Sequence, residues 1–140
     1  MRFIIILLFT QLTLLVFSQE SENKLQCERK LSTANIESAG EFLIELKITA
    51  PEDITGVVQL NEALPSGYIA EIVDNHGALF SFENGTAKFT WISFPKEKTF
   101  TVTYRVKSSE MLSVPEAIEG KVAYKRKRED NKQIASEQNF

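Results

Sequence analysis

The sequence predicts an all-β fold: an immunoglobulin-like or fibronectin type III-like β-sandwich of 7-8 antiparallel strands, with no disulfide. Three observations lead to this prediction. Apolar and polar residues alternate along most of the chain after residue 24, turn residues separate these runs at intervals of about 8–12 residues, and the chain has a single cysteine. Alternation of this kind places one face of each strand on a core and the other face in water.

Each predicted strand is a run of alternating residues between turn signals. In the segment 41–50, for example, Phe42, Ile44, Leu46 and Ile48 alternate with polar residues. Two segments, 55–63 and 68–74, differ because they carry apolar residues on both faces. The predicted strands are 25–30, 41–50, 55–63, 68–74, 78–83, 86–92, 98–107 and 117–125.

The dipeptide Asn84-Gly85 lies between two alternating runs and predicts a β-hairpin. A two-residue type I′ turn requires positive φ at both central positions, and Asn-Gly meets this requirement well. The turn fixes the register and places Phe80 opposite Phe89, with Trp91 on the same face. Because buried aromatic side chains contribute the most area, this group is the predicted centre of the core.

The predicted domain organisation has three parts: a signal peptide at 1-18, a β-sandwich domain at 19-128 and a disordered C-terminal tail at 129-140. Arg2 precedes a short apolar run, and Val16 and Ser18 occupy the −3 and −1 positions of a cleavage site, which is the layout of a secretory signal. We therefore expect export to the periplasm or the cell surface. An uncleaved signal is the alternative, and the only route to a membrane. The tail is polar and has no period.

Composition and charge narrow the function classes. The net charge is −3, so we expect no nucleic-acid partner. The one cysteine, Cys27, cannot form an internal disulfide, and the core must hold by packing alone. We expect Cys27 to be free and to behave as a small buried hydrophobe on the first strand. An intermolecular disulfide or a reactive thiol is the alternative.

The order of features from about residue 29 to residue 107 resembles the conserved-repeat domain of bacterial surface proteins, an immunoglobulin-like module. The matching segments are 38–42 (SAGEF), 60–68 (LNEALPSGY), 88–91 (KFTW) with Phe94-Pro95, and 100–106 (FTVTYRV). The export signal, ending in Ser-Gln, is similar to those of small exported proteins of Bacteroidota. The resemblance implies an extracytoplasmic, non-catalytic module with a structural or adhesive role.

No catalytic or metal-binding constellation is visible, so the sequence predicts that the protein is not an enzyme and holds no cofactor or metal. The one histidine, His76, lies in a turn sequence and has no second nitrogen or thiolate ligand nearby. Asp53, Asp74 and Asn75 could offer oxygens to calcium, but turn chemistry explains them. The acidic residues of the strands, such as Glu62, are expected on solvated faces. A small hydrolase built around His76 remains a third, weaker hypothesis.

Two groups of residues are candidate contact sites. The basic run Lys125, Arg126, Lys127 and Arg128 could touch an anionic surface, or could protect the end of an edge strand from aggregation. The polar face of the segment 98–107 is the second candidate, a flat docking face for a protein partner. Its members are Thr99, Thr101, Thr103 and Arg105.

The leading interpretation is an exported, non-catalytic module that binds an envelope or extracellular protein, in one mode by pairing an edge strand with a partner chain. The alternative is a carbohydrate-binding module, with a polysaccharide as partner. In that case Tyr68, Trp91 and Tyr124 would be the stacking rings, although the hairpin register predicts that Trp91 points inward.

Overall fold

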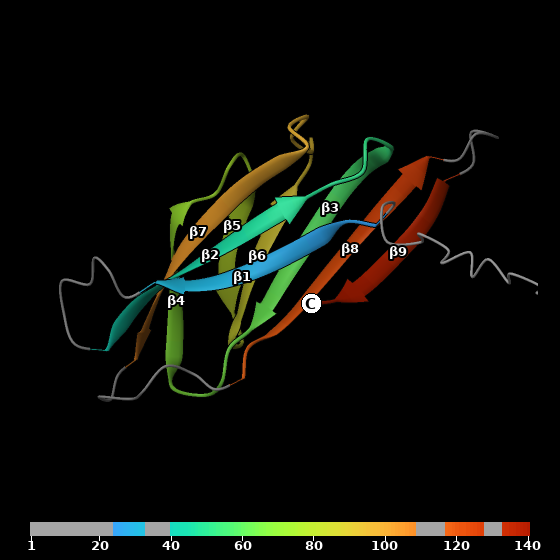
Figure 1. The fold of residues 1–140 in the computed structure, drawn as a ribbon. Coiled ribbons are helices and arrows are strands. Elements are labelled where there is room, and N and C mark those ends of the chain that lie inside the picture. The colour runs from blue at the N-terminus through green and yellow to red at the C-terminus, as the bar shows by residue number, and fades with distance from the viewer. Residues whose placement is uncertain (1–23, 33–39, 109–116, 128–132) are drawn as a thin grey trace, which may run out of the picture.

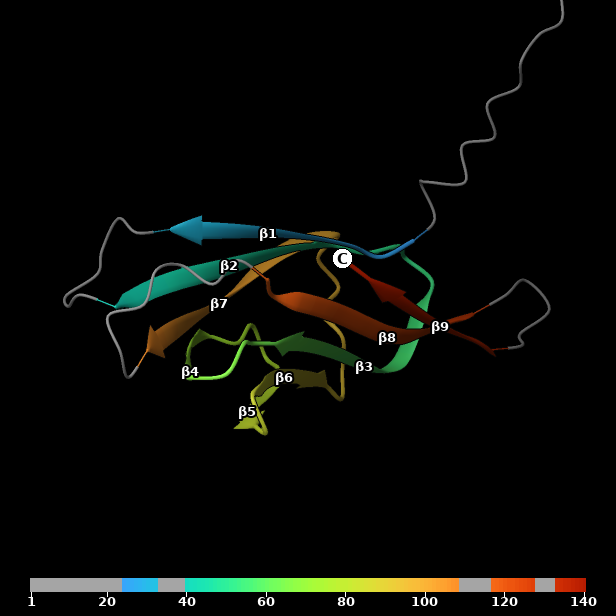
Figure 2. The same ribbon diagram turned by 90° about the horizontal axis from the view of Figure 1, so that it is seen from below.

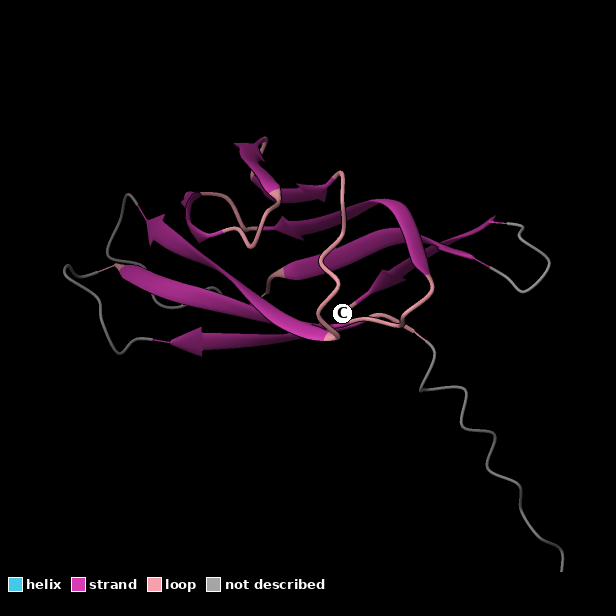
Figure 3. Cartoon of the chain, turned by 90° about the horizontal axis from the view of Figure 1, so that it is seen from above, coloured by secondary structure: helices cyan, strands magenta, loops and turns pink. Residues whose placement is uncertain are grey.

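A computed structural model describes residues 24–32, 40–108, 117–127 and 133–140 of the chain. These residues form nine strands and no helix (Figures 1 and 3). The predicted signal peptide lies outside the described residues. The strands are β1 (Gln26–Ser32), β2 (Glu41–Thr49), β3 (Ile54–Ala63), β4 (Tyr68–Asp74), β5 (Leu79–Glu83), β6 (Thr86–Trp91), β7 (Thr99–Ser108), β8 (Glu119–Lys127) and β9 (Gln133–Asn139).

The strands form two antiparallel sheets that face each other, as Figure 2 shows. The four-stranded sheet has the order β1-β2-β7-β4, and the five-stranded sheet has the order β5-β6-β3-β8-β9. The edge strands are therefore β1 and β4 in one sheet, and β5 and β9 in the other. This arrangement confirms the predicted β-sandwich.

The hairpin of β5 and β6 has the predicted register. Phe80 pairs with Phe89, and Glu83 pairs with Thr86 across the turn. The turn residues Asn84 and Gly85 have φ angles of 51° and 74°, as a type I′ turn requires. The local sequence therefore predicts the turn and the register of this hairpin correctly.

The core lies between the sheets and is richest in aromatic side chains where the hairpin meets β7. The rings of Phe89 and Trp91 are stacked with centroids 6.1 Å apart, and Phe80 meets Phe89 edge to face at 5.0 Å. Tyr104 of β7 is fully buried against the same group, with its ring centroid 5.9 Å from that of Phe89. The predicted centre of the core is thus confirmed, although Phe80 itself is only partly buried.

The end of the chain differs from the prediction of a disordered tail over 129-140. Residues 133–139 form β9, which pairs with β8 from Lys121↔Asn139 to Lys127↔Gln133. The apolar–polar alternation did not predict this strand because two of its inward positions, Ser136 and Gln138, carry polar side chains. Gln138 is nevertheless paired on this face: its side chain donates a hydrogen bond to the Leu25 carbonyl and accepts one from the Tyr124 hydroxyl.

One acidic side chain is buried between the sheets, contrary to the expectation that the strand carboxylates are solvated. Glu62 of β3 is fully buried. Its carboxylate accepts hydrogen bonds from Arg29 Nε at 2.9 Å, from Arg29 Nη2 at 2.5 Å and from the Tyr104 hydroxyl at 2.7 Å. Arg29 and Tyr104 belong to the opposite sheet, so this network joins the two layers.

Cys27 is free, partly buried and packed against the core beside this network. Burial raises the pKa of its thiol to about 12, and the nearby Glu62 carboxylate acts in the same direction. The thiolate is the reactive form of cysteine, so the folded protein keeps this side chain unreactive near neutral pH. Its position agrees with the expected role of a small buried hydrophobe.

We expect iodoacetamide at pH 8 to alkylate Cys27 far more slowly in the folded protein than in urea. The physical reason is that the raised pKa leaves almost no thiolate at this pH, whereas unfolding restores an ordinary thiol. Mass spectrometry of samples quenched over time gives both rates. Equal rates in the two conditions would show that the thiol is not protected by the fold.

Candidate interaction surfaces

The predicted docking residues Thr99, Thr101, Thr103 and Arg105 lie on the outer face of the four-stranded sheet. They belong to β7, which has β2 on one side and β4 on the other. An interior strand has no free backbone edge, so this strand offers a partner a flat face of side chains and no site for strand pairing.

The surroundings of these residues form a solvated, ion-paired surface. Lys107 Nζ lies 2.8 Å from a Glu71 oxygen and 3.7 Å from a Glu41 oxygen, and the hydrogen bond to Glu71 raises the pKa of Lys107. Lys30 and Glu45 approach to 4.0 Å on the same face. Exposed pairs of this kind contribute little stability, and they keep a face soluble.

The structure places the described residues of the basic run on different faces of β8. Lys125 and Lys127 are exposed on β8, whereas Arg126 points to the other face and binds Asp53. Arg126 Nη2 lies 2.6 Å from Asp53 Oδ2, and this contact raises the pKa of the guanidinium. Arg128 lies outside the described residues. At most three of the four residues could therefore face an anionic surface together.

An exposed aliphatic patch, which the candidate sites from the sequence did not include, follows the edge strand β4. Ile69 and Val73 are each 51% exposed, Ile72 is 40% exposed, and Leu79 of the edge strand β5 is 63% exposed. We call Ile69, Ile72 and Val73 the β4 edge. Its signal in the sequence was the presence of apolar residues on both faces of the segment 68–74. In a two-layer sandwich the outer face of each sheet points to solvent, so apolar residues on both faces of a strand cannot all be buried.

The opposite side of the sandwich is closed by side-chain contacts between the edge strands. Gln138 of β9 hydrogen-bonds to the Leu25 carbonyl just before β1, and Arg29 of β1 lies 5.4 Å from the centroid of the Phe140 ring. The hydroxyl of Tyr124 accepts a hydrogen bond from the Leu25 amide at 3.3 Å. The β4 edge therefore contrasts with a β1–β9 side whose edges are covered.

The ring platform suggested for carbohydrate binding does not exist as predicted. Trp91 and Tyr124 are buried, and Tyr68 is half-buried, with its ring edge to face with Phe42. Every aromatic side chain in the part of the chain that the structure describes is at least partly buried. Trp91 and Tyr124 therefore cannot stack on a sugar chain without rearrangement of the core.

His76 is held as a turn residue at one end of the sandwich. Its φ is 44°, its amide donates to Asp74 Oδ1 at 3.0 Å, and its ring stacks on Phe100 with centroids 4.7 Å apart. Its Nε2 lies 3.3 Å from Glu97 Oε2, and this contact lowers the pKa of Glu97. Within the described ranges, no three histidine, cysteine or acidic side chains gather as metal ligands would.

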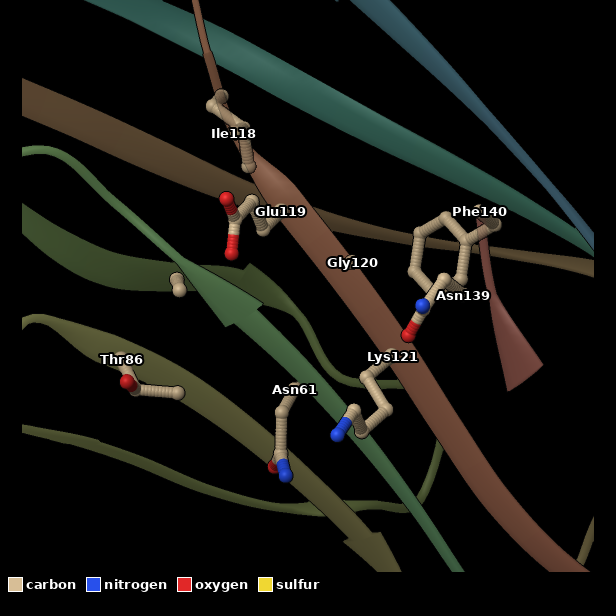
Figure 4. A pocket seen from close by; sticks show the side chains of 9 residues that line it. Asn61, Thr86, Ile118, Glu119, Gly120, Lys121, Asn139 and Phe140 are labelled. Carbon is tan, nitrogen blue, oxygen red and sulfur yellow. The ribbon is translucent and has the colours of Figure 1, made fainter. Parts of the chain in front are cut away.

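An open pocket of about 710 Å³ lies at the end of β8 and β9 (Figure 4). Asn61, Thr86, Glu119, Lys121 and Phe140 are among the residues that line it. The pocket brings together one carboxylate, one ammonium and neutral polar groups, with no nucleophile beside a base. Its main feature is the Phe140 ring, which lies against Gly120.

We expect Gly120→Ala to destabilise the protein by about 1–3 kcal/mol, the usual cost of overpacking. A Cβ at this position would lie 2.6 Å from Glu62 Oε1 and even closer to the Phe140 ring. Glu62 is fixed by its own hydrogen bonds and cannot move away. Urea unfolding measures the cost. Repeating it in a Phe140→Ala background should reduce the cost, and an unchanged value there would contradict the contact with the ring.

Among the described residues, no helix is long and apolar enough to cross a membrane. No family model matches the chain, and no curated protein matches its sequence. The resemblance to the conserved-repeat domain therefore receives support at the level of the fold alone.

Two solved structures share this fold. One is the chitin-binding domain of a hyperthermophilic chitinase from Pyrococcus furiosus, with a TM-score of 0.51 and 15% identity, covering 79% of this chain and 92% of that chain. The other is the full-length major pilin SpaD from Corynebacterium diphtheriae, with a TM-score of 0.55 and 11% identity, covering 82% of this chain and 34% of that chain. The chain thus has the β-sandwich fold found in these domains of a chitinase and a pilin.

Proposed function

We propose that this protein is an exported, non-catalytic module that binds a protein partner through the β4 edge. The observation that carries the proposal is the exposure of Ile69, Ile72 and Val73 on a strand that has only one neighbour among the described strands. A strand edge offers backbone hydrogen-bonding groups, and aliphatic side chains beside it offer apolar contact. Together these are the two components of recognition by strand addition.

The chemistry of the β4 edge defines the partner segment. The charged residues of β4 are both acidic, Glu71 and Asp74, and both are exposed. A complementary segment is extended, with aliphatic residues at alternate positions and a lysine or arginine between them. The register of β4 against β7 shifts between Ile72 and Asp74, so regular pairing would involve the first five residues of the strand.

Export remains part of the proposal because it rests on the sequence of residues 1-18. A fold that needs no disulfide is compatible with the periplasm or the cell surface. In this proposal the module binds its partner through the β4 edge, and the partner carries the membrane anchor or the enzymatic activity. A polysaccharide partner is less favoured by this structure, because the rings expected to bind it lie in the core.

The proposal is tested by NMR titration of the ¹⁵N-labelled protein with a short peptide of alternating valine and lysine. We expect chemical shift changes at the amides of β4 and at Leu79, and little change with a peptide of alternating valine and glutamate. Ile69→Lys, at a position 51% exposed within the pairing segment, should abolish the changes by placing a like charge at the edge. The matched control is Val57→Lys, since Val57 is 48% exposed but lies on β3. Changes confined to other strands, or equal effects of the two substitutions, would refute docking at this edge.

A further inference from the structure

β9 makes all of its backbone pairs with one neighbour, β8. Seven residue pairs join the two strands, and the Phe140 amide donates to the Gly120 carbonyl at 3.1 Å. β9 is also the last strand of the five-stranded sheet, so its removal would leave β5, β6, β3 and β8 paired as they are. An edge strand that pairs with a single neighbour is the element of a sheet that can open with the least loss of structure.

β9 is held by specific side-chain contacts. Phe140, which follows β9, packs against the core. Gln138 bonds to both Tyr124 and Leu25, and Glu137 lies 2.9 Å from Lys121. The segment 133–140 is therefore recognised by complementary groups.

The slot that receives β9 matches this segment closely. Gly120 leaves room for the Phe140 ring, as Figure 4 shows, because a side chain there would overlap the ring. With β9 absent, the Leu25 carbonyl would lose its partner, Tyr124 would lose a hydrogen-bond acceptor and Arg29 would lose its covering ring. A second copy of the same segment satisfies every one of these groups in the same geometry.

We propose that β9 exchanges between copies of this chain, so that the slot between β8 and β1 accepts residues 133–140 of another molecule. Exchange of an identical element replaces each intramolecular contact with the same intermolecular contact, and its energetic cost is therefore low. The occupant is a second copy because the contacts at Gly120, Leu25 and Tyr124 are specific to the side chains of this segment.

The same arrangement explains the lysines of β8. While β9 is paired, β8 is an interior strand and needs no protection against aggregation. When β9 leaves, β8 becomes an edge that carries the exposed side chains of Lys121, Lys125 and Lys127. Lysines on an edge strand oppose random pairing, so the open slot remains selective for the segment that fits it.

The experiment uses two full-length variants, each with one cysteine, in a Cys27→Ala background. One carries Lys125→Cys and the other carries Ala135→Cys, two exposed positions that face each other across β8 and β9. Opposite Cβ atoms lie about 4.5–5.5 Å apart in such a pair, which a disulfide can span with small adjustments. After mixing and mild oxidation, β9 of one copy on β8 of the other holds the two thiols together, so exchange raises the yield of mixed disulfide above the yield from collisions.

We expect a yield of mixed disulfide several-fold above that of a control mixture in which Lys47→Cys, exposed on the opposite sheet, replaces Lys125→Cys. Phe140→Ala adds a kinetic test. Because the resident strand must open before it can exchange, this substitution in either chain should raise the initial rate at which the mixed disulfide forms. Gln138→Ala serves the same purpose if the Phe140 variant does not fold.

Two results would overturn the proposal. A yield no higher than in the Lys47→Cys control means that copies do not exchange β9, and this includes the case in which the slot accepts only a strand of another protein. A rate of mixed-disulfide formation that Phe140→Ala leaves unchanged in both chains means that collisions, and not exchange, produce the disulfide. Neither result bears on the β4 edge, which lies on the other side of the sandwich.

Discussion

Replacing Glu62 with leucine should destabilise the protein by about 3–5 kcal/mol, the cost of breaking a buried ion pair by removing one partner. Arg29, whose side chain is 19% exposed, would lose both of its hydrogen bonds to the carboxylate. The Tyr104 hydroxyl, in a fully buried residue, would lose its acceptor at the same time. Since small domains are stable by about 5–15 kcal/mol, this variant would lose a large part of its stability.

A double variant distinguishes the free-energy cost of leaving Arg29 buried without a partner from the net contribution of the Arg29–Glu62 ion pair. The double substitution Arg29→Met with Glu62→Leu removes both charges, and such replacements are often neutral or stabilising. We therefore expect the double variant to be more stable than Glu62→Leu alone. Tyr104→Phe should cost about 1 kcal/mol, because it removes one hydrogen bond and leaves the ion pair intact.

Urea unfolding followed by the fluorescence of Trp91 measures these differences. If Glu62→Leu and the double variant have the same free energy of unfolding, the desolvated charge of Arg29 is not the cause of the loss. A measurable loss for Tyr104→Phe alone, equal to that of Glu62→Leu, would place the whole effect on the tyrosine. Either outcome would contradict a network in which the carboxylate is the shared acceptor.

The parts of the fold that depend on local rules could be predicted from the sequence. Strand positions follow from alternation, and the hairpin register follows from Asn84-Gly85, where two residues impose the φ angles of the turn. In these cases the information lies within a few residues of the feature it determines.

The parts that depend on distant partners could not be predicted in this way. Glu62 is separated by 33 residues from Arg29 and by 42 from Tyr104, so nothing near it in the sequence marks it as buried. β9 has polar residues on its inward face because Tyr124 and Leu25 offer hydrogen bonds there. For the same reason, the docking face predicted on β7 could not be recognised as an interior strand before the sheet order was known.

Trp91→Ala should be as damaging as the loss of Glu62, with an expected cost of about 3–5 kcal/mol for a large aromatic side chain in a core. Trp91 is fully buried, and its ring is in contact with the rings of Phe89, Phe94 and Phe100. Its indole Nε1 also donates to the His76 carbonyl at 3.1 Å. Alanine would leave a cavity between these three rings and an unpaired carbonyl in the turn.

A milder substitution connects this residue with the β4 edge. Trp91→Phe keeps an aromatic ring but removes the donor to His76, which lies in the turn between β4 and β5. We expect a smaller loss of stability than for alanine, together with NMR shift changes at the amides of Val73 and Leu79 that flank this turn. The control is Ile92→Ala, an exposed neighbour, for which we expect a change within about 0.5 kcal/mol. Because Trp91 is the only tryptophan, circular dichroism must follow unfolding here. A Trp91→Phe protein with an unchanged turn would mean that ring packing alone, without the hydrogen bond, holds the two edge strands in place.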